Sequence, residues 1–503
     1  MQWYRLSRRS LLRAGGALGL ACAVRPRTGR AQSDGVLRVR AYSDLQVLDP
    51  AHRKAQPEHD IMRAIYTKLI ENKPGDTWAW RTTGAASIEQ LDPTHVKFAL
   101  RPGIVFTGGF GEMTADDVKF SYERIADPEE KSEYADDFAE LDHVEVLDKY
   151  TGVIVLKQPF APLWTNALPG GSGCIMSRKA VEQAGGRFTT EPPASAGPYM
   201  IESWQPKQKL TLVRNPDWNG EPGGFDEIQI LPIDDEKAAE IAFEAGELDY
   251  TAVSVSSIPT YRESPPPHAM LVRKPSLAYV WLGMNTAAPP FDDIRVRHAV
   301  QRAVDVDAVL EAAYFGVAER ATGIIAPGLI GHRDKTLYGP EPDPKEARSL
   351  LAEAGHPNGF SCTLDILNKA ERLLAAQVIQ ANLAQIGIDV QINQHDSGAF
   401  WVLGSEADGD QWKSIQLILN RFSMQPDPSF ATAWFTPEQI GVWNWERFDS
   451  KEFGELHQKA MVTTDPAERD RMYRRMQDLM EESGAYLFLT HEVNGVIYRD
   501  TIV

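Results

Sequence analysis

Few residue patterns in this sequence have the types and spacing needed for catalysis or metal binding. His491-Glu492 begins like a zinc-protease motif, but Gly495 stands where the second zinc-binding histidine is needed. Gly108-Gly109-Phe110-Gly111 is similar to a phosphate-binding loop, yet no lysine follows it and Glu112 would repel a phosphate. The sequence contains neither the nucleophile elbow of serine hydrolases nor an EF-hand calcium loop. It therefore predicts no catalytic residues, no metal site and no cofactor.

The cysteines form neither a redox motif nor a zinc motif. Cys22 lies near the N-terminus, and only Cys174 and Cys362 follow it, with no Cys-x-x-Cys spacing. Two thiols this far apart in the chain favour two buried free cysteines. A disulfide formed in an oxidising compartment is the alternative.

The N-terminal segment, residues 1–31, has the features of an export signal. It contains seven arginines and no acidic residue, and a short apolar run follows Arg8-Arg9. The run is too short to span a bilayer, and the arginine pair with the leucines behind it resembles a twin-arginine signal. We expect cleavage after Ala31, with cleavage after Ala23 or lipid attachment at Cys22 as alternatives. A cytosolic chain with a basic N-terminal helix is the remaining alternative.

Length and charge restrict the class of protein further. The 503 residues are 43% apolar and 24% charged, which is typical of soluble globular proteins with two to four domains. The formal net charge is -18, and without the seven arginines of the signal, 45 basic and 70 acidic residues leave about -25. Such a surface repels phosphate backbones and anionic lipids, so we expect no nucleic-acid partner. No later segment has about 18 consecutive apolar residues, so we expect a soluble mature chain.

Alternating strand and helix patterns predict an α/β fold built in layers. Strand patterns occur at Val36–Tyr42, Val96–Leu100, Tyr279–Met284 and Ile388–Ile392. Helix starts are predicted by N-cap residues at Thr114, Asp343 and Asp465. Hairpin patterns concentrate between residues 90 and 160, which indicates a more antiparallel insertion toward the N-terminal side. The turn-rich segment 192–198 marks a candidate domain boundary.

Seven segments in a fixed order carry a family resemblance. They are Leu48-Asp49-Pro50, Phe98–Phe106, Thr114–Arg124, Gly197-Pro198-Tyr199, Gly246–Asp249, Met284–Arg297 and Asp343–Gly355. Together they resemble the family 5 extracellular solute-binding proteins, the dipeptide and oligopeptide receptors of ABC importers. The resemblance covers residues 36 to 498.

This resemblance implies a two-lobed periplasmic binding protein fold with an extra domain inserted in the first lobe. By analogy, lobe 1 comprises residues 34–66, 190–283 and 478–503, the inserted domain residues 67–189, and lobe 2 residues 284–477. A hinge that joins the lobes is expected at Met284, Asn285 and Ala485. Closure of the lobes on a ligand needs no covalent chemistry.

The resemblance also suggests which residues bind the ligand. Candidates are Tyr42, Ser43 and Asp44 in lobe 1 and Trp401, Asn420, Arg421, Phe422, Met424 and Asp427 in lobe 2. Peptide receptors of the family bind the ligand's amino terminus with an aspartate, and Met424 stands at that position here. Arg421 lies nearby and favours a ligand carboxylate, although Asp44 or Asp427 remain candidates for an amine. Surface pairing of Arg421 and core packing of the tryptophan are the structural alternatives.

The resemblance implies a periplasmic receptor that delivers its ligand to the membrane permease of an ABC importer. The expected ligand is peptide-like, opine-like or another amino-acid conjugate, and the receptor is expected to be a monomer and not an enzyme. A secreted hydrolase of cell-wall or peptide fragments is the main alternative. A chaperone-like or sensory relative is a third possibility.

Overall fold

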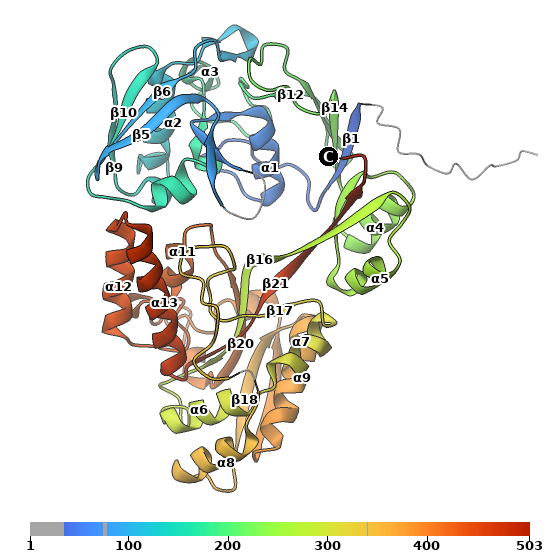
Figure 1. Cartoon of the computed structure of the whole chain (residues 1–503), viewed down its shortest axis with the longest axis vertical. Helices are drawn as coiled ribbons and strands as arrows, with labels where there is room; N and C mark the ends of the chain where they lie inside the picture. Colours follow the sequence, from blue (N-terminus) through green and yellow to red (C-terminus); the bar gives the residue numbers. More distant parts are fainter. Residues whose placement is uncertain (1–34, 74–77, 340, 503) are drawn as a thin grey trace, which may run out of the picture.

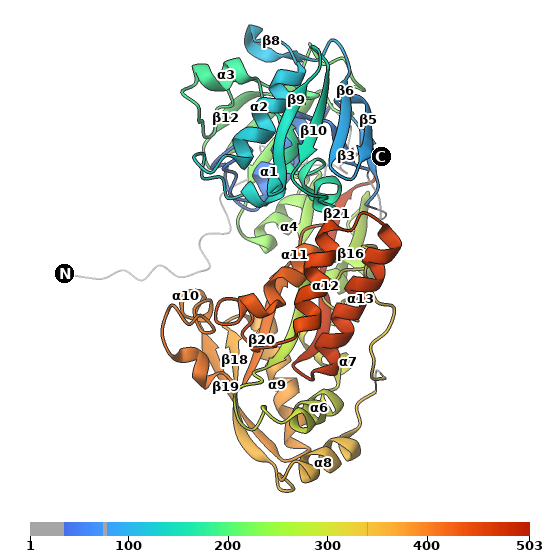
Figure 2. The ribbon, with the colours of Figure 1, turned by 90° about the vertical axis from the view of Figure 1, so that its left-hand side faces the viewer.

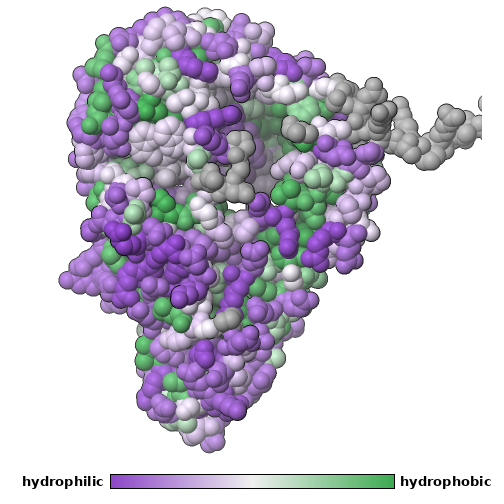
Figure 3. Space-filling view, in the orientation of Figure 1, coloured by the Kyte–Doolittle hydropathy of each residue, from purple (hydrophilic) through white to green (hydrophobic). Residues whose placement is uncertain are grey.

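The computed structural model describes residues 35–73, 78–339 and 341–502. The expected signal peptide, with both cleavage sites and Cys22, lies outside the described residues. The molecule is elongated, with lobe 1 and the inserted domain at one end and lobe 2 at the other (Figures 1 and 2). Hydrophilic residues cover most of the face in Figure 3, which is hollowed between these two ends. Among the described residues, no helix is long and apolar enough to cross a membrane.

One sheet of eleven strands runs through both lobes. Its order is β12-β13-β14-β1-β15-β21-β16-β20-β18-β19, and β17 pairs with β21. Lobe 1 contributes β1 (Val36–Ala41), β12 (Tyr199–Gln205), β13 (Lys209–Arg214), β14 (Glu227–Pro232) and β15 (Tyr250–Val253). Lobe 2 contributes β17 (Glu319–Arg320), β18 (Phe360–Leu367), β19 (Ile388–His395) and β20 (Leu417–Ser423). The long strands β16 (Ala269–Met284) and β21 (Tyr486–Arg499) belong to both lobes.

Helices cover both faces of the sheet in each lobe. Lobe 1 has α1 (Gln56–Ile65) over one face and α4 (Glu236–Glu244) and α5 (Ile258–Glu263) over the other. In lobe 2, one apolar core contains α6 (Ile294–Ala303), α7 (Val306–Tyr314), α8 (Pro344–Glu353) and α9 (Ala370–Ala384). Short helices α10 (Ser397–Phe400) and α11 (Ser429–Thr432) join α12 (Lys451–Val462) and α13 (Pro466–Glu482) on the opposite face. The predicted N-caps Asp343 and Asp465 are confirmed, since each accepts hydrogen bonds from its helix.

The inserted domain has its own antiparallel sheet and core, as the hairpin patterns predict. Its sheet contains β5 (Ala85–Asp92), β6 (His95–Leu100), β10 (Thr151–Leu156) and β9 (Leu141–Val146), in that order. Helix α2 (Ala115–Ala126) begins with the predicted capping box of Thr114 and Asp117, and α3 (Arg178–Gln183) follows later in the chain. Two-stranded pieces complete the domain: β2 (Thr67–Lys68) with β11 (Cys174–Ile175), β3 (Ile70–Asn72) with β4 (Trp80–Thr82), and β7 (Val105–Phe106) with β8 (Gly111–Glu112).

Two expectations about single residues are settled by this packing. Cys174 and Cys362 are buried and free, as the sequence favoured. The glycine-rich segment 108–111 is a tight turn that joins β7 and β8, with Gly108 and Gly109 at φ 74° and 79°. These backbone angles need glycine, so the turn explains the motif without a phosphate.

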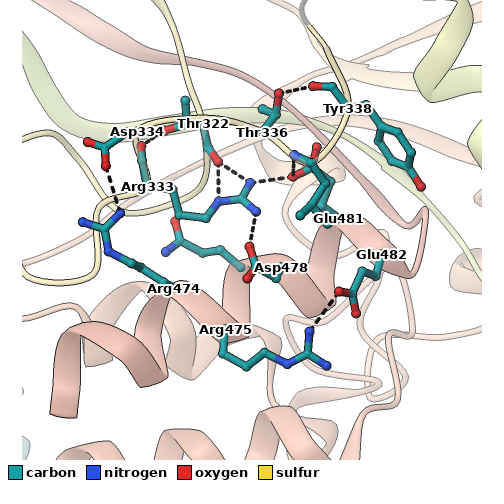
Figure 4. A network of polar contacts seen from close by, with 12 residues as sticks. Thr322, Arg333, Asp334, Thr336, Tyr338, Arg474, Arg475, Asp478, Glu481 and Glu482 are labelled. Atoms are coloured by element: carbon teal, nitrogen blue, oxygen red, sulfur yellow. Dashed lines mark hydrogen bonds and ion pairs between the residues drawn. The ribbon is translucent and has the colours of Figure 1, made fainter.

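A long segment without regular helix, residues 321–339, crosses lobe 2 and is held on α13 by a buried arginine (Figure 4). The Arg333 guanidinium donates to the Thr322 carbonyl oxygen. It also forms ion pairs of 2.7 Å with Asp478 and 2.7 Å with Glu481, both on α13. Arg333 thereby fixes a loop that has few backbone hydrogen bonds of its own.

The lobes are joined where β16 and β21 cross between them, and this point differs from the expected hinge. Met284 pairs with Leu417 of β20 and is fully buried in lobe 2. Asn285 is buried beside it, with its amide donating to the Ile415 carbonyl oxygen, and Ala485 is buried in the same lobe. These residues therefore belong to the lobe 2 core, and the expected domain boundaries at 283 and 478 also fall within lobe 2. The apolar strand Tyr279–Met284, which leads to the expected hinge, is a buried core strand.

Candidate functional site

A cleft of about 600 Å³ lies between the lobes, over the two crossing strands. Lobe 1 lines it with Glu236, at the start of α4, and with Ser254, Val255 and Ser256, which follow β15. Lobe 2 lines it with Tyr314, Phe315, Glu371, Leu374, Arg421 and Ser423. The cleft therefore opens beyond the carboxyl ends of β15 and β20, the place where open α/β sheets bind ligands.

A chain of four polar side chains runs along the lobe 2 wall of this cleft. Arg421 Nε donates to Glu492 Oε2 at 2.9 Å, and the Arg421 side chain is 43% exposed. The other oxygen of Glu492 accepts from Arg372 Nη2 at 2.5 Å. Arg372 is buried and also donates from Nη1 to the Tyr314 hydroxyl at 2.5 Å. The chain therefore links α7, α9, β21 and β20.

The charge state of Glu492 follows from these neighbours. Burial alone would raise the pKa of this carboxyl, but Arg372 and Arg421 outweigh it and lower the pKa below its usual value. Glu492 is therefore ionised at neutral pH. Arg421 contacts Glu492 through Nε, so its Nη1 and Nη2 groups form no hydrogen bond within the described residues. Those groups can receive a carboxylate from a ligand.

Two further carboxylates line the cleft from opposite lobes. Glu236 belongs to lobe 1 and Glu371 to lobe 2, and neither forms an ion pair within the part of the chain that is described. Hydroxyl groups also line the cleft, at Ser254, Ser256, Ser276 and Ser423. The cleft thus offers one basic group, free acidic groups and several hydroxyls to a ligand. This combination suits a polar molecule that carries both signs of charge.

Of the predicted ligand residues, Arg421 is the one that lines this cleft. In lobe 1, Tyr42 is 51% exposed and its hydroxyl accepts from the Gln56 amide at 3.3 Å. Ser43 and Asp44 border a separate small cavity of about 10 Å³. Asp44 accepts from the Lys207 amide at 2.7 Å, so it holds the turn that joins β12 and β13. The structure does not bring these three residues to the cleft.

Asp427 and Met424 are both buried away from the cleft. Asp427 is fully buried and forms an ion pair of 2.9 Å with Arg469 of α13. It also accepts from the Thr165 hydroxyl at 2.7 Å, and Thr165 belongs to the inserted domain. Met424 packs in the core of lobe 2. In this conformation Asp427 ties two domains together and has no free oxygen for a ligand amine.

Asn420 and Phe422 lie on the face of β20 opposite Arg421, because side chains alternate along the strand, and Trp401 packs against Phe422 on that face. Phe422 is the centre of an aromatic cluster, and Trp401 stacks on it with ring centroids 6.3 Å apart. Asn420 is buried, and its side-chain oxygen accepts from the Arg421 amide. Core packing, the structural alternative weighed for the tryptophan, therefore describes these three side chains.

Most of the residues that build the cleft have no local signal in the sequence. Glu236, Tyr314, Glu371, Arg372 and Glu492 come from three helices and a strand, so no spacing in the chain brings them together. Glu492 offered one clue, because it is the one carboxylate of the largely buried strand β21. In the sequence it was considered only as part of an incomplete zinc motif.

Comparisons with known proteins agree with this architecture. Residues 85–441 match the model of bacterial extracellular solute-binding proteins, family 5 Middle. The glutathione-binding protein GsiB of Escherichia coli K12 is 27% identical over 491 residues, covering 95% of this chain and 92% of the relative.

Solved structures show the same two-lobed arrangement. DppA from Helicobacter pylori, in complex with the peptide STSA, has a TM-score of 0.72 and 25% identity. The alignment covers 92% of this chain and 94% of DppA. MoaA from A. tumefacien R10, in complex with mannopinic acid, has a TM-score of 0.70 and 26% identity, with 92% and 94% of the chains covered. The expected periplasmic binding protein fold is thus confirmed.

These relatives are binding proteins, which favours a receptor over the alternative of a secreted hydrolase. The seven motifs, the two-lobed fold and the matched 85–441 segment lead to one assignment. The chain belongs to the family 5 bacterial extracellular solute-binding proteins, which serve ABC importers that take up peptides or related ligands.

Proposed function

We propose that this protein is a periplasmic receptor for an amino-acid conjugate that carries both a carboxylate and an amine. The observation that supports this ligand class is the mixed charge of the interlobe cleft. Arg421 presents two free nitrogen groups there, and Glu236 and Glu371 present free carboxylates from opposite lobes. A ligand with one charge sign would leave part of the cleft repulsive or unpaired.

Lobe closure would turn this binding into a signal for transport. A ligand that contacts Glu236 in lobe 1 and Arg421 in lobe 2 binds the closed form better than the open form, so it shifts the population toward closure. The closed receptor is then the form that the membrane permease recognises. A twin-arginine signal at residues 1–31 would carry the chain to the periplasm after it has folded.

Three relatives suggest which molecules to test first. GsiB is named as a glutathione-binding protein, DppA is described with the peptide STSA, and MoaA with mannopinic acid. All three ligands combine carboxylate and amine groups, as the cleft requires. Met424 stands where peptide receptors use an aspartate, which favours conjugates over standard peptides. We propose a monomeric receptor, since each cleft is complete within one chain.

Arg421→Ala tests this proposal directly. Native mass spectrometry of protein purified without refolding would show the retained ligand, and calorimetry would measure glutathione, the peptide STSA and mannopinic acid. A charge-assisted hydrogen bond contributes about 1.5–3 kcal/mol, so we expect the variant to bind at least about tenfold more weakly. Arg471→Ala, which removes an exposed arginine on α13, is the matched control. Equal affinity of the Arg421 variant and the wild type would refute the role of Arg421.

A further inference from the structure

The pairing of the two crossing strands is interrupted at one point between the lobes. Pro275 of β16 pairs with Val493 of β21, and the next pair joins Tyr279 to His491. Three residues of β16, Ser276 to Ala278, therefore lie opposite Glu492 alone. Such a bulge interrupts the hydrogen-bonded pairing of β16 with β21, which allows these two strands to bend relative to each other there.

The neighbouring strands place this break at the boundary of the lobes. On one side of it, β21 pairs with β15 of lobe 1, ending at Val253 and Gly495. On the other side, β16 pairs with β20 of lobe 2, beginning at Ala278 and Ser423. Hinges between domains are formed by a few residues that absorb the change in backbone angles. Figure 1 shows β16 and β21 crossing between the lobes, and the break in their pairing has the position and the length of such a hinge.

Glu492 lies at this break, and its side chain is held entirely by lobe 2. Arg372, from α9, and Arg421, from β20, each bind one of its carboxylate oxygens. Arg372 is fixed in turn by the Tyr314 hydroxyl of α7. The backbone of Glu492 is thus part of the hinge, while its carboxylate is bound to a side chain that faces the ligand cleft.

We propose that Glu492 is a positioning residue that couples the Arg421 ligand site to the hinge between the lobes. This inference rests on the proposed function of Arg421 as the group that binds a ligand carboxylate. Glu492 holds Arg421 by its Nε atom and leaves Nη1 and Nη2 free to bind a ligand. A ligand bound to Arg421 stiffens that side chain, and the ion pair transmits the restraint to the backbone at residue 492.

A different role for Glu492 would have a different geometry. If Glu492 served only the stability of lobe 2, an ion pair with buried Arg372 would be enough for that role. Arg421 would then not need to contact Glu492. If it competed with the ligand, it would occupy the Nη groups of Arg421 instead of Nε. The observed contact through Nε, at 2.9 Å, supports positioning.

The test measures the separation of the lobes in the empty protein. Spin labels on α4 of lobe 1 and α8 of lobe 2 would report the interlobe distances of wild type, Glu492→Gln and Arg421→Met. We expect both variants to broaden the distance distribution, because each removes the ion pair that restrains the hinge. Glu247→Gln, which changes an exposed carboxylate of lobe 1, is the control and should leave the distribution unchanged. Arg421 is exposed, so Arg421→Met keeps the test informative if Glu492→Gln does not fold.

The ligand side is tested separately with glutathione, the peptide STSA and mannopinic acid as probes. For any probe that binds, Glu492→Gln should weaken affinity at least fivefold although Arg421 is intact, and the double variant should lose no more than Arg421→Met alone. If no probe binds the wild type, the proposed ligand class fails, but the interlobe distances still decide the hinge coupling. Wild-type distance distributions in both variants would overturn the proposal, whatever the affinities.

Discussion

Asp427 should be essential for stability and not for ligand recognition, in contrast to the expectation from the family resemblance. Its carboxylate is fully buried, and Arg469 Nη2 lies 3.0 and 2.9 Å from its two oxygens. The Ser429 amide and the Thr165 hydroxyl complete its hydrogen bonds at 3.0 and 2.7 Å. Burial would raise the pKa of Asp427, but Arg469 outweighs this effect and keeps the pKa below its usual value. The group is therefore a buried anion paired with a buried cation.

Asp427→Asn leaves the Arg469 guanidinium buried without a counter-charge. Breaking a buried pair in this way costs about 3–5 kcal/mol of unfolding free energy. For a unit of about 200 residues, roughly the size of lobe 2, this lowers Tm by roughly 6–20 °C, since each kcal/mol shifts it by about 2–4 °C. The double variant Asp427→Asn/Arg469→Met should recover part of the loss, because it also removes the uncompensated charge.

Differential scanning calorimetry and ligand titration together decide the role of Asp427. We expect a lower Tm with near-normal affinity in the fraction of Asp427→Asn that is folded. Glu455→Gln, an exposed carboxylate on α12, is the matched control and should stay within about 0.5 kcal/mol of wild type. A normal Tm combined with loss of amine-bearing ligands would show that Asp427 reaches the ligand, and our reasoning about the buried pair would then be wrong.

Two further predictions concern stability. Arg333→Met should destabilise lobe 2 by about 3–5 kcal/mol, because Asp478 and Glu481 lose their common partner. Limited proteolysis of this variant should then cut the 321–339 segment. An uncut segment would contradict this role of Arg333. Burial lowers the pKa of His457 to about 4 and of His491 to about 3, so the unfolded chain binds more protons than the folded one below pH 6.5. Urea unfolding should therefore show a free energy of unfolding that is largest above pH 6.5 and falls by about 1.4 kcal/mol per histidine for each pH unit below that. His491→Phe should make this fall shallower. An unchanged slope in the variant would show that His491 does not cause the fall.

The sequence predicted the overall fold because local signals and the family motifs agreed. Thr114, Asp343 and Asp465 begin helices in the structure, since an N-cap needs only its own helix. The hinge residues Met284, Asn285 and Ala485 were expected from the family resemblance, and their burial in lobe 2 depends on pairing partners that the sequence does not show. The apolar strand that ends at Met284 is a strong local signal, but burial and a domain crossing both produce apolar strands, and only the pairing partners distinguish them.

The candidate site was predictable only in part, because its residues depend on tertiary packing. Arg421 was identified by its place in a family segment, and it lines the cleft. Asp427 was suggested by the same segment, but Arg469, some forty residues later, turns it into a buried pair. No sequence pattern predicts that Arg469 pairs with Asp427. Glu492 was overlooked because its two arginines are distant in sequence and meet it only through the sheet and α9.

The charge of the ligand has to be inferred from the cleft and not from the whole molecule. The mature chain has a net charge near -25, but charges farther than about 8 Å apart in solvent are largely screened at physiological salt. The cleft is lined by one basic group, Arg421, and by the carboxylates of Glu236, Glu371 and Glu492, so both signs of charge are present there. Closing an empty cleft would bring Glu236 toward Glu371, and their repulsion would oppose closure. Under the proposed function, a ligand amine placed between these carboxylates would offset their repulsion while the ligand carboxylate binds Arg421, so a ligand with both charges should favour closure more than a ligand with either charge alone.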